Sequence, residues 1–348
     1  MKKDDIIKRV KFSELNIEDD FFRSLKDDYE GFENWFRSKK NENALVVFSQ
    51  DHKVTAFMYL KKENGVEEGI YPELSGNRIK IGTFKISDYH KGTSLGKRFL
   101  AHALRIFAEY DNYEKIYVTA FDVKQQQLVN LLKRYGFKEF GKKKEETVYV
   151  KNRMVTSNVY ESYPFVSEQN KNKYLLSILP RFHNKMFSES DLKTQNYYEN
   201  IASYNNIEKI YLSASSNASS LRYGDIIIPY RTAEANMPAK YSSVVSAINV
   251  IVDIKNICDF ANFDDFKEYI RENSVFSDTE LKSFWNQKRF PWIIKFLYNV
   301  PFKKYPNRKV LLENKIIDEE RIVISRLTES SYESIKKLGD VDESYFIN

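Results

Sequence analysis

Residues 81–100, IGTFKISDYHKGTSLGKRFL, constrain the fold more than any other stretch of this chain. An extended apolar run ends in a short loop of Gly, Ser and Thr, and this loop leads directly into an amphipathic helix. The amides of such a loop and the positive end of the helix dipole converge on one point, which favours an anion. The stretch therefore predicts a site for a phosphorylated ligand.

The length of 348 residues predicts two domains. The single cysteine, Cys258, excludes an internal disulfide framework and indicates a reducing, cytoplasmic compartment. The N-terminus MKKDDIIKRVKF lacks the apolar core of a signal peptide, and no run approaches ~18 apolar residues. We therefore expect a cytoplasmic protein without a membrane span.

The first half, residues 1–152, alternates strand and helix patterns. We expect strands at 44–49, 54–61, 78–86 and 115–121, helices at 94–110 and 125–135, and a closing hairpin at 138–143 and 146–151. The helix after the loop places apolar residues on one face at i, i+4 spacing. Gly136 is placed to end the second helix.

The pattern changes after residues 153–164, which indicate a linker. We expect strands at 174–180, 209–215, 225–231, 244–254 and 321–327, helical sequence between 262 and 300, and a final helix at 330–339. Strands with irregular connections favour a small, mostly β barrel with helical insertions over residues 165–348.

The net charge of +6 is too small to imply a nucleic acid by itself. Residues 281–310, however, contain eight Lys and Arg and eight aromatic residues, with no Asp or Glu. Cations neutralise phosphates and aromatic faces stack on bases, so this window suits single-stranded nucleic acid through Lys303, Lys304 and Arg308. The alternative is a helix with core aromatics and solvated lysines.

The loop is neither a Walker loop nor a dinucleotide fingerprint, and residues 1–152 instead resemble the GNAT acetyltransferases. The family's Arg/Gln-x-x-Gly-x-Gly/Ala falls on Lys91–Gly96, with Lys91 in place of Arg or Gln and Ser94 in place of the first Gly. The segment LLKRYGFKEFG resembles the family's helix–Gly–Phe–strand ending. The resemblance implies an α+β fold with a mixed sheet, and acetyl-CoA as co-substrate.

The resemblance also implies roles for individual residues. The main chain of Phe84 and Ile86 would pair with the pantetheine arm, and its amides would polarise the acetyl carbonyl. The loop amides would hold the pyrophosphate, and Lys97 would either meet an outer phosphate or be solvated. The implied cofactor residues are Phe84, Ile86, Lys91, Gly92, Thr93, Ser94, Leu95, Gly96 and Lys97.

Catalytic roles are harder to assign. The family often has a general-acid Tyr four residues before the Gly of its Gly–Phe pair, and that position is Leu132, which cannot protonate a thiolate. Tyr135, Tyr117 and Thr119 are nearby alternatives, and His90 beside the loop is a candidate base. The other interpretation is a domain that has lost turnover.

The second half resembles a PUA-like barrel of the ASCH/EVE kind, through SLRYGDIIIPYRTAE at 220–234 and KYSSVVSAINVIVDI at 240–254. Relatives of this barrel commonly recognise RNA or modified bases, which implies Tyr230 and Arg231, with Ser213 and Asn217, as wall and rim residues. Alternatively, Tyr230 is core and Arg231 caps its strand. His183 has no second His or Cys at ligand spacing, so we expect no metal.

Together these features predict an acetyl-CoA-dependent N-acetyltransferase acting on an amine presented by RNA, such as tRNA or aminoacyl-tRNA, in the manner of a toxin. One alternative is a protein or small-molecule acetyltransferase whose barrel is a scaffold. Another is a non-catalytic module that binds coenzyme A and RNA. We expect RNA as a partner, no membrane, and an oligomeric state that the sequence leaves open, a homodimer included.

Overall fold

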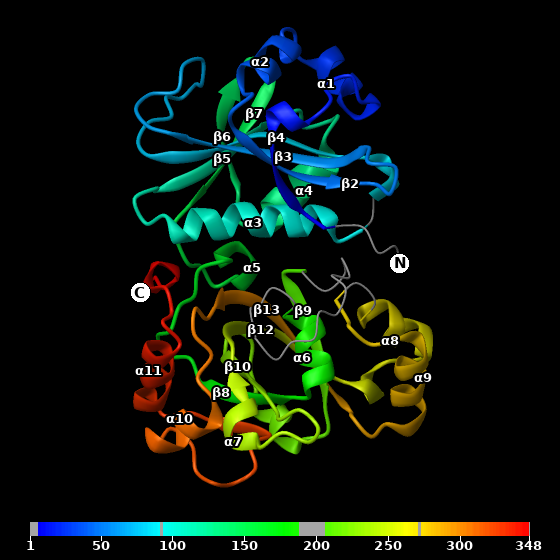
Figure 1. The fold of residues 1–348 in the computed structure, drawn as a ribbon, viewed down its shortest axis with the longest axis vertical. Coiled ribbons are helices and arrows are strands. Elements are labelled where there is room, and N and C mark those ends of the chain that lie inside the picture. The colour runs from blue at the N-terminus through cyan, green and yellow to red at the C-terminus, as the bar shows by residue number, and fades with distance from the viewer. Residues whose placement is uncertain (1–5, 91–92, 188–205, 271–272, 348) are drawn as a thin grey trace. The chain divides into compact units, whose positions relative to one another are not determined.

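The computed structural model describes residues 6–90, 93–187, 206–270 and 273–347 (Figure 1). These residues form two compact units, and the chain passes from the first to the second between Arg153 and Met154. Each unit is built on a mixed sheet of seven strands, so the fold class is α+β. No helix in the described ranges is long and apolar enough to cross a membrane.

The N-terminal unit contains one sheet in the order β1-β2-β3-β4-β5-β7-β6. Its strands are β1 (Lys8–Lys11), β2 (Asn43–Phe48), β3 (Val54–Glu63), β4 (Arg78–Ile86), β5 (Lys115–Ala120), β6 (Lys138–Lys143) and β7 (Glu146–Asn152). Only β4 and β5 run parallel. A parallel pair needs a crossover connection, and α3 (Leu95–Glu109) supplies it.

Helices cover both faces of this sheet (Figure 1). On one face lie η2 (Asp20–Phe22), α1 (Arg23–Asp28) and α2 (Phe32–Ser38). They build an aromatic core in which Phe12, Phe22 and Phe36 pack on Phe57 of β3. On the other face, α3 packs on β4 and β5, and α4 (Gln126–Arg134) packs on α3.

The C-terminal unit has the sheet order β14-β8-β10-β12-β13-β9, with β11 on β10. Its strands are β8 (Lys173–Ile178), β9 (Glu208–Ser213), β10 (Ile226–Arg231), β11 (Val244–Val245), β12 (Ala247–Asn256), β13 (Trp292–Pro301) and β14 (Ile324–Arg326). Strands β8 and β10 are parallel and the other pairs antiparallel. Over the described residues no ladder joins β14 to β9, so a closed barrel is not confirmed.

Seven helices accompany this second sheet in the described ranges: α5 (Val159–Ser162), α6 (Pro180–Met186), α7 (Ala239–Ser242), α8 (Phe263–Ile270), α9 (Asp278–Gln287), α10 (Arg308–Glu313) and α11 (Glu329–Leu338). The main apolar core involves α6, α8 and α9 packed on the sheet. Helix α5 falls within the stretch expected to be a linker.

One sequence-based prediction in this unit is wrong. Residues 292–300 are not helical but form β13, which pairs with both β12 and β9. This strand, WIIKFLYNVP, is buried along most of its length, so it lacks the strict apolar–polar alternation that marks a half-exposed strand. Pro291 immediately precedes this strand and Pro301 is its last residue, so neither proline lies in its interior.

Candidate functional site

Strands β4 and β5 pair over only part of their length. Their parallel ladder covers Arg78–Ile81 and Lys115–Val118. On its other edge, β4 remains paired with β3 as far as Ile86. The last part of β4 therefore has a neighbour on one edge only.

The hydrogen-bond pattern with β3 fixes which peptide groups face the open edge. Ser87 N–H donates to the carbonyl of Thr55 at 2.8 Å, so these two residues form a hydrogen-bonded pair. Pairs along an antiparallel ladder alternate, so Lys85 also directs its peptide groups toward β3. The N–H and C=O groups of Phe84 and Ile86 consequently point toward the side from which β5 has separated.

A cavity of about 490 Å³ lies at this edge. It is lined by β4, the β4–α3 loop, the start of α3, and the β5–α4 connection. Of the predicted cofactor residues, it brings together Phe84, Ile86, Thr93, Gly96 and Lys97. Ser94 is half-buried and Leu95 is buried in the core, and neither lines the cavity. Lys91 and Gly92 lie outside the described residues.

The first turn of α3 forms one rim of the cavity. Thr93 Oγ1 donates to the carbonyl of His90 at 2.7 Å and accepts the Leu95 N–H at 3.3 Å, so the loop is tied to the helix. Gly96 lies against β4 and α4, because a Cβ there would be 3.4 Å from both Ile86 Cδ1 and Leu131 Cδ2. The positive end of a 15-residue helix thus borders the cavity.

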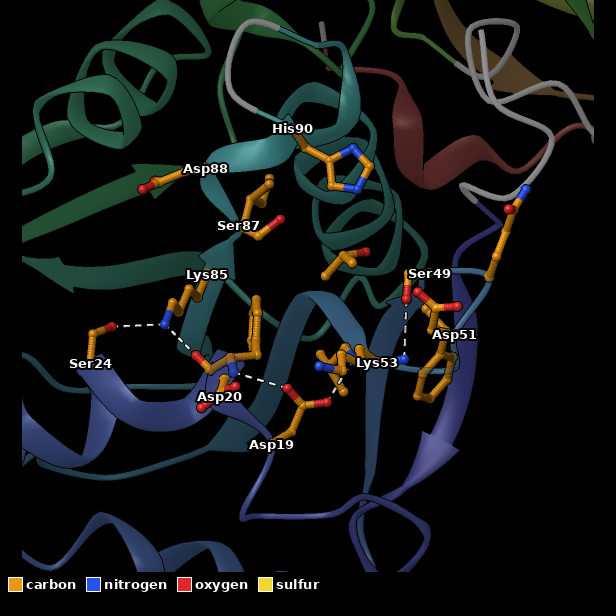
Figure 2. Close-up of a pocket in the computed structure, with 16 residues that line it drawn as sticks. Asp19, Asp20, Ser24, Ser49, Asp51, Lys53, Lys85, Ser87, Asp88 and His90 are labelled. Carbon is orange, nitrogen blue, oxygen red and sulfur yellow. Dashed lines mark hydrogen bonds between the residues drawn. The ribbon is translucent and has the colours of Figure 1, made fainter.

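A second cavity, of about 670 Å³, lies at the same end of β4 (Figure 2). It is bordered by η2, the start of α1 and the β2–β3 turn. Lys85, Ile86 and His90 line both cavities. Figure 2 shows Lys85 extending from β4 toward Ser24, to which its Nζ donates at 2.7 Å, and it also donates to the Phe21 carbonyl. Burial lowers the pKa of Lys85, and the Asp88 charge partly opposes this effect.

The second cavity is lined by more acidic than basic side chains, although one of the acidic residues, Asp20, pairs with Arg23. Its lining contains four aspartates and two lysines: Asp19, Asp20, Asp51, Asp88, Lys53 and Lys85. Asp19 accepts the N–H groups of Phe21 at 2.9 Å and Val54 at 3.0 Å, which fixes the carboxylate beside the start of β3. Such a lining attracts a cationic group and repels a phosphate.

Of the three residues expected to be catalytic, only His90 lies at these cavities. Its side chain is buried. Tyr135 is buried at the end of α4, and Leu132 is buried one turn earlier. Neither the cavity beside α3 nor the acidic cavity includes Tyr135 or Tyr117 in its lining.

Tyr117 belongs to a buried ionic network at the paired ends of β4 and β5. Its hydroxyl donates to Glu63 Oε2 at 2.8 Å, and Arg78 Nε lies 3.3 Å from the same oxygen. Burial, and then the hydrogen bond to Glu63, raise the pKa of Tyr117 far above its usual value. The geometry gives this phenol a structural contact rather than a catalytic one.

Sequence reasoning missed the contribution of the β5–α4 connection. Residues 123–128 line the cavity beside α3, and Gln125 Oε1 fixes the connection by accepting the Phe121 N–H at 2.8 Å. The topology of the sheet could have predicted this contribution. Loops that follow parallel strands emerge at the same edge of the sheet, where ligands bind in such folds.

Of the four residues expected to contact a base in the C-terminal unit, Tyr230, Arg231 and Ser213 are buried, whereas Asn217 is exposed and its Nδ2 donates to the Ile324 carbonyl at 3.1 Å. Arg231 is fully buried, where its Nε donates to Asn184 Oδ1 at 2.8 Å and its Nη2 pairs with Glu234. Burial lowers the pKa of Arg231. Tyr230 is also buried, with its hydroxyl 3.4 Å from Arg308 Nη1.

The cations expected to contact phosphate each have an acidic partner. Lys303 Nζ lies 3.3 Å from Asp342, Lys304 Nζ 3.2 Å from Asp340, and Arg308 Nη2 3.8 Å from Glu319. Their charges are therefore largely offset. Nowhere in the described ranges do three His, Cys, Asp or Glu side chains gather in a way that could hold a metal.

Comparison with known proteins assigns part of the chain. Residues 10–137 match the family model of the acetyltransferase (GNAT) family, and members of this family use acetyl-CoA. This part of the chain is a GNAT acetyltransferase domain. No curated protein matches the chain.

Among solved structures, the chain is similar to AtaTR bound with AcCoA, at 14% identity and a TM-score of 0.33, over 42% of this chain and 94% of that one. It is also similar to ASCH from Zymomonas mobilis, at 11% identity and a TM-score of 0.32, over 49% and 96%. It is similar as well to a GNAT-family acetyltransferase from Staphylococcus aureus, at 14% identity and a TM-score of 0.31, over 42% of this chain and 99% of that one.

Proposed function

We propose that the protein is an acetyl-CoA-dependent N-acetyltransferase that binds its co-substrate in the cavity beside α3. The observation that carries the proposal is the open edge of β4, with the peptide groups of Phe84 and Ile86 directed away from β3. The pantetheine amides would pair with these groups as a neighbouring strand does. The first turn of α3 lies at the same cavity, where its N–H groups suit a pyrophosphate.

The groups on this edge also suit the reaction. Acetyl-CoA supplies an acetyl group on a thioester, and its carbonyl gains negative charge as an amine attacks. A backbone N–H aimed at that oxygen stabilises the charge at no cost of reorganisation. Lys97, at the cavity, would meet an outer phosphate.

His90 is the proposed general base. It lines both cavities, so it lies between the proposed donor side and the acidic cavity. An amine must lose its proton before it can attack, and an imidazole is the side chain most often used to accept such a proton. Leu132 at the family's usual general-acid position means that the departing thiolate leaves without help from a phenol at that position.

We propose that the acceptor amine enters the acidic cavity and that the C-terminal unit, as a PUA-like barrel, holds an RNA that carries this amine. The carboxylates attract an ammonium group, while the phosphates would be held on the other unit. The same carboxylates favour a second candidate, in which the acceptor is a free polycationic amine or a protein lysine and the C-terminal unit is a scaffold.

Isotope transfer from labelled acetyl-CoA tests the proposal. Purified protein is incubated separately with total RNA, with a protein extract and with a polyamine pool. Label on RNA supports the first candidate, and label on protein or polyamine supports the second. Calorimetry on the same sample measures acetyl-CoA binding. If acetyl-CoA binds but no label reaches any of the three pools, both candidate functions are overturned. The protein would then be a non-catalytic module that binds coenzyme A.

A further inference from the structure

We propose a phosphate-binding site for a nucleic acid strand in the cavity formed by the start of β8, strand β14 and the start of α11. The cavity measures about 370 Å³ and is lined by Lys171, Asn172, Lys173, Arg326, Leu327, Thr328 and Glu329. The inference rests on the RNA-binding part of the proposed function. It places the phosphate contact away from Lys303, Lys304 and Arg308.

The cavity has an uncompensated positive charge. Lys173 is buried and contacts both carboxylate oxygens of Glu329, at 2.7 and 2.8 Å, so this pair is neutral. Lys171 and Arg326 remain, and neither has a carboxylate partner within the described ranges. Two cations that share one cavity without acidic partners favour an anionic ligand.

Arg326 is held in place by a chain of hydrogen bonds through Asn172 to Asp225. Its Nη2 donates to Asn172 Oδ1 at 2.6 Å, and Asn172 Nδ2 donates to Asp225 Oδ1 at 3.3 Å. Asp225 is buried and also accepts the N–H groups of Asn172 at 3.2 Å and Arg222 at 2.9 Å. The guanidinium is therefore oriented before any ligand arrives, which lowers the entropic cost of binding.

Lys171 is positioned by Gly224. A Cβ at Gly224 would lie 2.8 Å from Lys171 Nζ, so the ammonium occupies the space that a side chain there would need. The φ angle of +83° gives a second reason for glycine at this position. Tyr223, the preceding residue, is exposed and offers an aromatic face on which a base can stack.

The cations predicted from sequence provide a matched contrast. Lys303 and Lys304 are exposed, as a nucleic acid contact requires, yet each is already paired with an aspartate. A phosphate that replaced these partners would gain little net attraction. The sequence shows only that lysines cluster in this window. The structure shows which of them are already paired with a carboxylate.

Fluorescence anisotropy with a labelled single-stranded RNA, using the full chain over a series of salt concentrations, tests the proposal. Lys171→Gln and Arg326→Gln each remove one cation, and Lys303→Gln and Lys304→Gln serve as matched controls. We expect each of the first two variants to weaken binding about fivefold. The slope of log K against log salt should fall by about 0.7 for each contact removed, and the controls should leave it unchanged.

The outcomes separate this inference from the proposed function. If the wild-type protein binds RNA and the Lys171 and Arg326 variants show the same slope of log K against log salt, the proposed site is wrong. The RNA-binding part of the proposed function is then unaffected. If the controls lose the slope instead, the contact lies at residues 303–304. If the wild-type protein binds no RNA, both the site and the RNA part of the proposed function are overturned. Circular dichroism checks that the variants remain folded.

Discussion

Gly96 at the start of α3 lies against Ile86 of β4, with 3.4 Å between Ile86 Cδ1 and the place that a Cβ on Gly96 would take. The contact leaves room for one methyl group and no more. It also puts residue 96 in the wall of the proposed donor cavity. The size and charge of the side chain there should therefore control co-substrate binding without affecting the sheet.

Substitution of Gly96 tests this relationship. Gly96→Glu would put a carboxylate beside the expected pyrophosphate, and we expect no measurable acetyl-CoA binding by calorimetry. Gly96→Ala is the matched control, because a Cβ fits at ordinary contact distance and Ala is preferred to Gly in a helix by about 1 kcal/mol. The Gly96→Ala variant should bind acetyl-CoA, and its melting temperature should be no lower than that of the wild type. Unchanged affinity in Gly96→Glu would remove the site assignment.

His90→Asn should lower kcat/KM for acetyl transfer by at least about 10²-fold, the usual contribution of a general base. Acetyl-CoA affinity should change little, because the proposed contacts to the co-substrate come from the main chain of β4 and the first turn of α3 and not from the His90 imidazole. His52→Asn is the control, since His52 is exposed in the β2–β3 turn and its φ of 57° suits Asn. Equal rates for the two variants would exclude His90 as the base.

Tyr117→Phe should affect stability and not catalysis. It removes the hydroxyl that donates to Glu63 and leaves that buried carboxylate with one donor fewer. We expect a loss of about 1–3 kcal/mol in the free energy of unfolding, measured with urea. Tyr71→Phe on an exposed side chain is the control. A fall in kcat with an unchanged free energy of unfolding would instead support a catalytic role for Tyr117.

The fully buried His183 should make the C-terminal unit less stable in acid. Burial, and then the charge of Arg231, lower its pKa from 6.5 to about 3. As pH falls from about 6.5 to 3, the unfolded chain takes up a proton that the folded chain does not. The free energy of unfolding should therefore decrease by about 1.4 kcal/mol per pH unit in this window, and the contribution is fully present above it.

His183→Gln separates this effect from the titration of carboxylates. A Gln side chain retains a partner for Ser246, which lies 2.8 Å from His183 Nε2, and does not titrate. Urea unfolding can be followed through Trp285 and Trp292, two of the three tryptophans. The variant should show a shallower dependence on pH between 6 and 4. Identical slopes would mean that His183 is protonated in the folded protein.

Periodicity predicted much of the N-terminal unit. The strand expected at 78–86 is β4 to the residue, and the helix expected at 94–110 is α3 at 95–109. Both patterns depend on local sequence, where one face is apolar. The short elements β1, α1 and α2 were missed, because four to seven residues contain too few repeats of any period.

Several residues named for the co-substrate line one cavity, whereas several residues named for catalysis or base recognition are buried. The loop pattern and the resemblance to the GNAT acetyltransferases named Phe84, Ile86 and Gly96, and these three residues line one cavity. Their role in binding acetyl-CoA stays a prediction. The burial of Tyr117, Tyr230 and Arg231 could not be predicted from the sequence, because the residue type alone does not distinguish a buried Tyr or Arg from an exposed one. Charge pairing of the kind that offsets Lys303 depends on residues distant in sequence.

The separation of β4 from β5 has a consequence for amide exchange. Along β4 the amide hydrogens of Lys85 and Ser87 face β3, while those of Phe84 and Ile86 face the gap. Exchange with deuterium should therefore alternate residue by residue in the free protein, fast at 84 and 86 and slow at 85 and 87. Acetyl-CoA that pairs with this edge should slow the two fast amides and leave the others as they are.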